Sequence, residues 1–362
     1  MTITNKSKSF RFIDLFAGIG GFRCGLSALR GECVFTSEWD KFSAQTYSTW
    51  FADASIYTED IRDVEIKDIP SHDVLAAGFP CQPFSLAGVS KKASLGRPHG
   101  FNDQSQGNLF FQICRIAEVH RPKILLLENV KNLKSHDKGR TWDVIQQSLL
   151  DLNYTVFHRV IDAAHWVPQH RERIFIVAFA NEHLKKSREN EFHWPDIGYG
   201  EGPAVAEILE PAPNKKYMLG DKTWACLQGH AENHRKKGNG FGYGICDTSG
   251  ISRTLSARYH KDGAEILIKQ RGWRNPRRLT PNEAKRLMGF DNHFAQAFNH
   301  SDGFPICVSD TQAYRQFGNS VVPYAVEYVG RAAFSYFLKN AKANVTKIFE
   351  RTVQEGQALT YK

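Results

Sequence analysis

The chain has 362 residues, of which 41% are hydrophobic and 23% charged, a globular composition with room for one large and one smaller domain. Lys and Arg outnumber Asp and Glu by 47 to 38. The net charge of +9 favours a polyanionic partner, because cationic side chains displace the counterions that phosphates condense. The polar, basic start and the lack of any apolar run of roughly 18 residues argue against a signal peptide and a membrane-spanning protein.

The seven cysteines are scattered, odd in number and without a CxxC pair. This pattern argues against disulfides and against a zinc site, and it predicts a reducing cytoplasm as the setting. His230 and His234 flank Glu232, but the spacing is not the HExxH of zinc enzymes because the acid is displaced by one position. We therefore expect no metal.

Strand-like and helix-like stretches alternate through the first half of the chain, which is typical of a parallel α/β sheet. A predicted strand at 10–16 is followed by a glycine turn and by a helix that begins near Phe22. The other predicted strands are 33–37, 74–77, 124–127 and 174–179, and the stretches 109–119 and 141–150 have helical spacing.

Beyond about Asn181 the sequence becomes rich in Pro, Gly and aromatic residues, with weak periodicity. The glycines of 236–244 disfavour a helix there. Residues 190–312 are therefore predicted to form a second, irregular and basic domain, with 1–189 plus 313–342 as the large domain. A helix is expected at 325–338, and 343–362 is expected to be a loosely attached C-terminal tail.

The glycine turn at 14–22 follows a strand and opens a helix, so a ligand could approach its backbone closely. It is not the dinucleotide fingerprint GxGxxG, because Arg23 occupies the position of the last glycine. At the end of the next strand, Glu38 could bind both hydroxyls of a ribose, and Trp39 could lie against an adenine. Asp60, beside Ile61, could accept a hydrogen bond from the adenine amino group. This set favours S-adenosylmethionine over NAD; the alternatives are a structural turn and a core aromatic at Trp39.

Cys81 stands between Pro80 and Pro83, just past a predicted strand. The prolines stiffen the turn and fix the sulfur at the sheet edge, where open α/β sheets bind their ligands. A cysteine nucleophile must become a thiolate, so it needs an environment that lowers its pKa from about 8.5. The alternative is a small buried hydrophobe.

Glu128 follows the next predicted strand, so its carboxyl group could reach the same pocket and carry a proton if burial raises its pKa. Arg171 and Arg173 precede another strand, where alternation would put both on one face. Their charge could bind a phosphate or a base and favour a thiolate. The alternatives are a capping carboxylate and a salt-bridged strand end.

These segments, in this order, resemble the motifs of the cytosine-C5 DNA methyltransferases. The turn at 16–22, Pro-Cys-Gln at 80–82, Glu-Asn-Val at 128–130 and Gln-His-Arg-Glu-Arg at 169–173 are joined by two later segments. Residues 278–284 with 287–290 look like the ninth motif of the family, and 314–321 resemble the tenth. The resemblance spans roughly residues 10–335.

The resemblance implies that Cys81 attacks C6 of a cytosine flipped out of duplex DNA while Glu128 contacts N3, which makes C5 nucleophilic enough to accept a methyl group. Arg171 and Arg173 would line the catalytic pocket. It further implies a Rossmann-like mixed-sheet domain, a smaller target-recognition domain, a monomer, and a cognate restriction endonuclease as a partner of some members. The residues expected around S-adenosylmethionine are Phe16, Gly18, Ile19, Gly20, Gly21, Glu38, Trp39, Asp60, Ile61, Asn319 and Ser320.

Segments 238–243 and 253–263 resemble the recognition domain of Dcm-type enzymes, which act on the inner cytosine of CCWGG, with relatives acting on other CC…GG sites. One departure is His260, where a second Tyr is expected. The predicted DNA-binding residues are Ser85, Arg253, Arg258 and Lys261, for which solvated side chains are the alternative.

Three other functions compete with this prediction. An RNA methyltransferase of the same family would have a much shorter recognition region. A nucleic-acid-binding module without activity is disfavoured by Cys81, Glu128 and Asn319 being in place. An NAD-dependent dehydrogenase would need the missing last glycine and leaves Pro-Cys-Gln unexplained.

Overall fold

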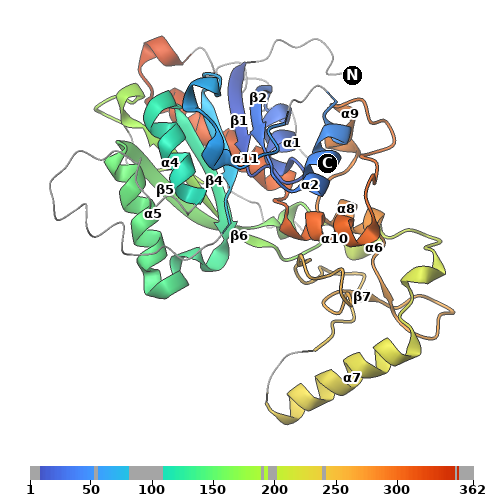
Figure 1. Ribbon diagram of the computed structural model, residues 1–362. Helices are drawn as coiled ribbons and strands as arrows, with labels where there is room; N and C mark the ends of the chain where they lie inside the picture. Colours follow the sequence, from blue (N-terminus) through green and yellow to red (C-terminus); the bar gives the residue numbers. More distant parts are fainter. Residues whose placement is uncertain are drawn as a thin grey trace.

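The main sheet of the protein has six strands in the order β2-β1-β3-β4-β6-β5 (Figure 1). The computed structural model describes residues 9–52, 56–80, 109–188, 191–194, 202–238, 242–346 and 349. The strands are β1 Phe10–Leu15, β2 Gly31–Ser37, β3 Val74–Gly78, β4 Ile124–Val130, β5 Tyr154–Asp162 and β6 Glu172–Ala180.

The sheet is mixed, because β1 to β4 run parallel and β6 is antiparallel to both of its neighbours. This confirms the α/β fold class and the mixed sheet that the family resemblance implies, and it corrects the purely parallel sheet expected from the alternation of elements. Strand β5 was not predicted. It is an edge strand in which most residues are half-buried or exposed, so it lacks the continuous apolar run that marks the central strands.

Two hydrophobic cores cover the two faces of the sheet, as the alternation of side chains along a strand requires. Phe10 and Phe12 belong to the core that includes α1 (Gly21–Ala28) and α11 (Pro323–Asn340). Ile13 and Leu15 belong to the core under α4 (Leu109–His120) and α5 (Arg140–Asp151). Helix α2 (Lys41–Trp50) packs with the first of these cores.

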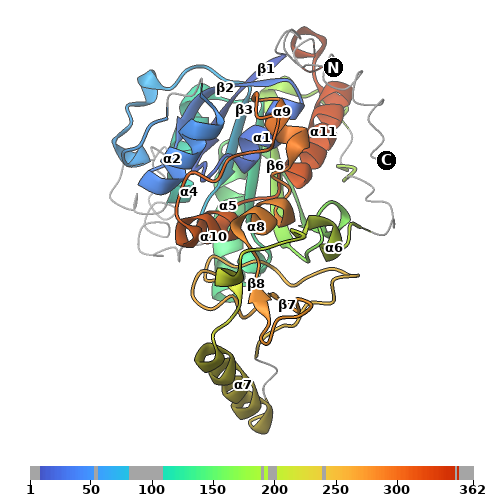
Figure 2. The ribbon, with the colours of Figure 1, turned by 90° about the vertical axis from the view of Figure 1, so that its right-hand side faces the viewer.

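Helices α1 and α11 come from opposite ends of the chain and lie in close contact (Figure 2). A Cβ atom at Gly25 of α1 would lie 2.7 Å from the carbonyl oxygen of Pro323 and from Val326. Since real Cβ atoms do not approach backbone that closely, the absence of a side chain at Gly25 sets the separation of the two helices.

The described residues of 202–278, called here the projecting region, begin beside α8 and then extend away from the sheet, with α7 farthest out (Figures 1 and 2). This region contains α6 (Val205–Ile208), α7 (Asp221–Lys236) and a small hairpin of β7 (Leu267–Ile268) and β8 (Arg277–Arg278). Helix α7 has no buried residue. The expectation of an irregular segment is wrong for these 16 residues.

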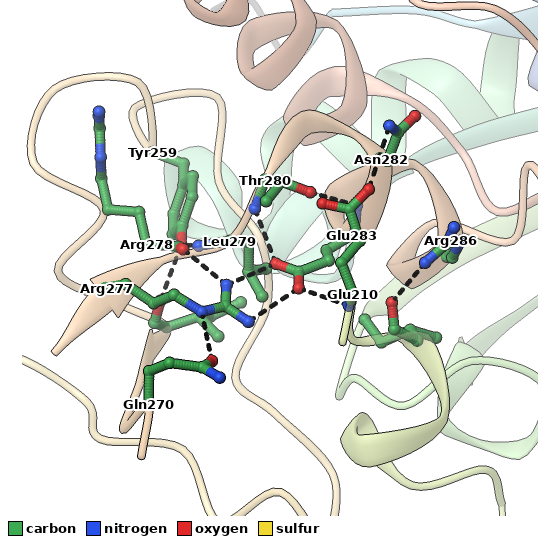
Figure 3. A network of polar contacts seen from close by, with 12 residues as sticks. Glu210, Tyr259, Gln270, Arg277, Arg278, Leu279, Thr280, Asn282, Glu283 and Arg286 are labelled. Carbon is green, nitrogen blue, oxygen red and sulfur yellow. Dashed lines mark hydrogen bonds and ion pairs between the residues drawn. The ribbon is translucent and has the colours of Figure 1, made fainter. Parts of the chain in front are cut away.

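A buried polar network joins the projecting region to α8 (Pro281–Leu287), as Figure 3 shows. The guanidinium of Arg277 donates to both carboxylate oxygens of Glu283, at 2.7 and 2.8 Å, and both side chains are fully buried. Glu283 also accepts from the backbone N–H groups of Thr280 and Glu210, and Gln270 accepts from Arg277. The two fully buried charges, Arg277 and Glu283, therefore have several partners each, as buried charges require.

Residues 281–312 pack on the sheet body as well as against the projecting region. They include α8, α9 (Asn292–Gln296) and the start of α10 (Asp310–Asn319). Phe304 stacks on Trp50 of α2 with ring centroids 4.2 Å apart, and the Trp50 indole donates to the Pro305 carbonyl. These contacts join residues before 312 to the large domain, whereas the sequence predicted the domain boundary at 312. The expectation of a loose tail is wrong for Phe349, which is buried against Phe10, Phe334 and Phe337.

Candidate active site

A cavity of about 500 Å³ lies where β1, β3 and β4 end. Its walls come from the turn after β1, from Gly78 to Pro80 after β3, from the end of β4, and from the last turns of α10. This is the edge at which open α/β sheets bind ligands.

The glycine turn holds Glu38 at one end of this cavity. The Gly18 N–H donates to one carboxylate oxygen of Glu38 and the Asp40 N–H to the other, both at 2.8 Å. Burial raises the pKa of Glu38, and these two hydrogen bonds oppose the rise. Gly18 has a φ of +55° and open space where a Cβ would lie, so the turn leaves room for a ligand beside its backbone.

Trp39 lies at the rim of the same cavity and is 65% exposed. This exposure excludes the alternative of a core aromatic. The indole therefore presents an uncovered aromatic face beside the Glu38 carboxylate, as stacking on an adenine would require.

Four of the expected cofactor residues do not line the cavity. Ile19 is buried, and a Cβ at Gly20 would clash with Phe51, so both shape the turn from behind. Asp60 caps the short helix η1 (Ile61–Asp63) and forms an ion pair with Arg62, while Ile61 is buried in the core that includes α4. Arg62 donates to both carboxylate oxygens of Asp60. A hydrogen bond from an adenine amino group to Asp60 stays a prediction.

Glu128 and Arg173 meet on the cavity wall opposite the glycine turn. Arg173 Nε lies 3.1 Å from Glu128 Oε1, across the antiparallel pairing of β4 with β6. Burial raises the pKa of Glu128, and the positive charges of Arg173 and Arg171 oppose that rise. The arrangement is therefore a buried carboxyl group that keeps its proton more readily than usual beside a partly exposed guanidinium.

Asn129, whose role the sequence did not suggest, ties the end of β4 to the chain that leads into Pro80. Its side-chain amide donates to the Phe79 carbonyl at 2.8 Å and accepts from the Val130 N–H. Pro80 lines the cavity. The predicted nucleophile Cys81 and the predicted DNA contact Ser85 lie outside the described residues.

Arg171 does not line the cavity, in contrast to the expectation that it shares a pocket face with Arg173. It precedes β6, and its buried guanidinium donates to the backbone carbonyls of Leu255, Gly318 and Ser320. Burial lowers its pKa to about 9. The contacts make Arg171 a link between the projecting region, the end of α10 and the strand that carries Arg173.

Asn319 and Ser320, at the end of α10, line the cavity together with Gln312 and Arg315 from earlier in the helix, and their role toward a cofactor stays a prediction. Gln312, Arg315 and Asn319 recur at helical spacing on one face of α10. No helix was predicted at 310–319, so this stripe was missed; helical periodicity across these residues is the signal that could have found it.

The three described DNA-binding candidates lie on the segment from 251 to 263 of the projecting region. Arg253, Arg258 and Lys261 are exposed, and none forms an ion pair with another described residue. Their side chains are therefore available to a phosphate or a base edge. No group of three or more His, Cys, Asp or Glu residues suited to a metal ion occurs in the part of the chain that the structure describes.

The mixed sheet, with its antiparallel penultimate strand, glycine turn and terminal acid on β2, defines a Rossmann-like methyltransferase. The family model of the C-5 cytosine-specific DNA methylases matches residues 10–335, and the chain belongs to this family. The predicted family and enzyme class are thereby confirmed.

Two named relatives are 46% identical to the chain. The DNA-cytosine methyltransferase of Escherichia coli strain K12 matches over 87% of this chain and 75% of its own length. The type II methyltransferase M.NlaX of Neisseria lactamica matches over 86% of this chain and 92% of its own.

A solved structure of a Spodoptera frugiperda DNMT2 mutant superposes with a TM-score of 0.69, covering 90% of this chain and all of that one. At 21% identity this likeness supports the fold alone. In the described part of the chain, no helix has both the length and the apolar character needed to cross a bilayer.

Proposed function

We propose that this enzyme transfers a methyl group from S-adenosylmethionine to C5 of a cytosine flipped out of duplex DNA, with Cys81 as the covalent nucleophile. The observation that carries the proposal is the Glu128–Arg173 pair, which lies on one wall of the cavity while Glu38 and Trp39 lie on another. A nucleoside-bearing cofactor fits the second wall, where Glu38 can accept from ribose hydroxyls beside the uncovered turn at Gly18.

The residues of the chain would each handle one part of the reaction. The Cys81 thiolate forms a bond to C6 while Glu128 holds a proton at N3, so electron density moves onto C5. When bound, S-adenosylmethionine supplies the methyl group and leaves as a neutral thioether. Loss of the C5 proton to a base then expels the Cys81 sulfur from C6 and restores the aromatic ring. Arg173 would hold Glu128 and lend positive charge to the pocket.

We propose that DNA lies against both the sheet body and the projecting region, with target recognition assigned to 190–280. The remainder of the expected recognition domain, 281–312, is better grouped with 1–189 and 313–342, because it packs on the sheet. We propose a CC…GG-type site because segments 238–243 and 253–263 resemble the recognition domain of Dcm-type enzymes. Relatives named as type II methyltransferases support a cognate restriction endonuclease as a partner. We further propose a monomer that acts on cellular DNA, testable by sedimentation with and without a duplex.

Replacement of Cys81 by Ser tests the mechanism. We expect the variant to lose methyl transfer and largely retain DNA binding, since a serine hydroxyl is far less acidic than a thiol. Tritiated methyl transfer measures the first property and gel shift the second. Full activity of the variant would refute the covalent mechanism.

The same assay with duplex DNA and with tRNA separates the two nucleic-acid substrates. Incorporation into tRNA alone would overturn the proposal. Bisulfite sequencing of DNA from cells that express the chain would then define the methylated site.

A further inference from the structure

A second cavity, of about 430 Å³, lies within the projecting region and shares no lining residue with the active-site cavity. Three segments enclose it: the first turn of α7, the chain at 243–245, and the turn at 269–276. The first two segments contribute one aromatic ring each, and the turn contributes one aromatic ring and two cationic groups. Its volume falls within the range of about 300 to 1,000 Å³ that is usual for small-molecule sites.

Aromatic rings form the walls of this cavity. Trp224 of α7 and Tyr243 meet edge to face with centroids 4.7 Å apart, and Trp273 faces the same space from the turn. All three side chains are only partly buried. Because α7 buries no residue, these rings are not the centre of a small hydrophobic core, and part of their aromatic surface stays open to a ligand.

Cations lie at the rim of the cavity. Lys269 and Arg274 line it and are exposed, and among the described lining residues none is acidic. Within the described part of the chain, Lys269 forms no ion pair. Asp221 is the nearby carboxylate, and it is already bound by Arg274 at 3.0 Å and by Asn275 at 2.7 Å.

The walls are held in place before any ligand binds. The Asn275 side chain donates to the Leu219 carbonyl as well as to Asp221, which pins the turn to the start of α7. The backbone N–H of Trp273 donates to the backbone carbonyl of Gln270, and Gly272 has a φ of +77°, as the third residue of a type II turn requires. Trp273 is therefore presented by a closed turn.

We propose that this aromatic pocket binds a second nucleobase of the bound DNA, unstacked from the duplex, while Lys269 contacts its phosphate. Open aromatic faces with a cation at the rim are the combination that binds single-stranded nucleotides, because every nucleotide has a base with a π-face and a phosphate. The inference rests on the proposed function in taking DNA as the bound polymer. It adds to the flipped target cytosine a second extruded position, held by Trp224, Tyr243 and Trp273.

Mismatch scanning tests this proposal. An enzyme that extrudes a base binds more tightly when that base is already unpaired, because the cost of unpairing is removed. A series of duplexes would carry the site found by bisulfite sequencing and one mismatch at each successive position. We expect tighter binding, by about tenfold, at the target cytosine and at one further position.

The two tryptophans provide matched variants. Trp224→Leu and Trp273→Leu should abolish the gain at the further position and keep the gain at the target cytosine, whereas Trp224→Phe and Trp273→Phe should keep most of both. Lys269→Gln should weaken all duplexes alike and reduce the salt dependence. Circular dichroism and thermal melting would confirm that each variant is folded.

The outcomes separate this inference from the proposed function. If the wild-type protein does not bind more tightly to a duplex with a mismatch at the target cytosine, base flipping into the active site is refuted. The aromatic pocket is not a nucleobase site if no mismatch away from the target cytosine tightens binding. The same conclusion follows if the tighter binding at a second position persists in both Leu variants. Loss of the gain in the Phe variants as well would assign the rings to packing within the protein, and would also overturn the proposal.

Discussion

Two arginine–glutamate pairs in this molecule have opposite surroundings. Arg277 and Glu283 are fully buried, joined by two hydrogen bonds, and surrounded by the donors and acceptors of the network in Figure 3. Arg173 and Glu128 share one contact of 3.1 Å at the wall of the cavity, and both retain some exposed side-chain surface. The saturated pair has no capacity left for a ligand, whereas the open pair does. The number of satisfied partners therefore distinguishes a structural ion pair from a candidate catalytic one.

The largest expected effect comes from removing the acid of the open pair. Glu128→Gln should lower the rate of methyl transfer by about 10²- to 10⁴-fold, because the proton at N3 loses its donor. Binding of S-adenosylhomocysteine should stay within about twofold, since Glu38 and Trp39 are untouched. Single-turnover kinetics and calorimetry measure the two effects. Glu172→Gln, which alters an exposed carboxylate on β6 paired with Lys131, is the control and should stay active.

The next effect concerns the saturated pair and is one of stability. Glu283→Ala leaves the Arg277 charge buried without its partner, which should cost about 3 to 5 kcal/mol in the free energy of unfolding. Urea denaturation measures this loss. The double variant Arg277→Met with Glu283→Leu should recover much of it, because no unpaired charge remains. A single variant as stable as the wild type would contradict the structural role of this pair.

A smaller effect is expected from pH. Burial raises the pKa of Glu128, so the protonated form persists to higher pH than in an ordinary glutamate. The rate of methyl transfer should therefore fall as the pH rises through this raised pKa. The falling limb should vanish in Glu128→Gln, whose amide does not titrate. A limb that persists in that variant belongs to another group, and would remove Glu128 as the acid.

The smallest effect is expected at a third pair, on the surface of α7. Arg235 is largely exposed, and Glu232, one helical turn away, is partly exposed. Arg235→Ala should therefore change the free energy of unfolding by less than about 1 kcal/mol. The same urea titration as for Glu283→Ala gives a direct comparison. A loss of several kcal/mol would show that α7 packs on a partner, since none of its residues is buried in this chain.

The sequence predicted the central strands and the acid at the end of β4 because buried parallel strands are continuous apolar runs that end at the ligand edge. It missed α7 for a related reason. Hydrophobic periodicity reports a buried face, and a helix without one has no such signal, although Asp221–Lys236 contains good helix formers. Arg171 was misplaced because strand alternation was applied to a residue that precedes its strand. Its contacts come from residues 84 to 149 positions away, which no local pattern records.

The contact at Gly25 has a consequence for biosynthesis. Helix α11 follows every strand of the sheet that it covers, so the apolar surfaces of α1 and of one sheet face stay uncovered until residue 340 has left the ribosome. A chain that stops after the projecting region would hold most of the catalytic side chains but neither the last wall of the cavity nor this covering helix. Translation must therefore pass α11 before this sheet face is covered, and products that stop earlier would expose apolar surface as incompletely folded chains do.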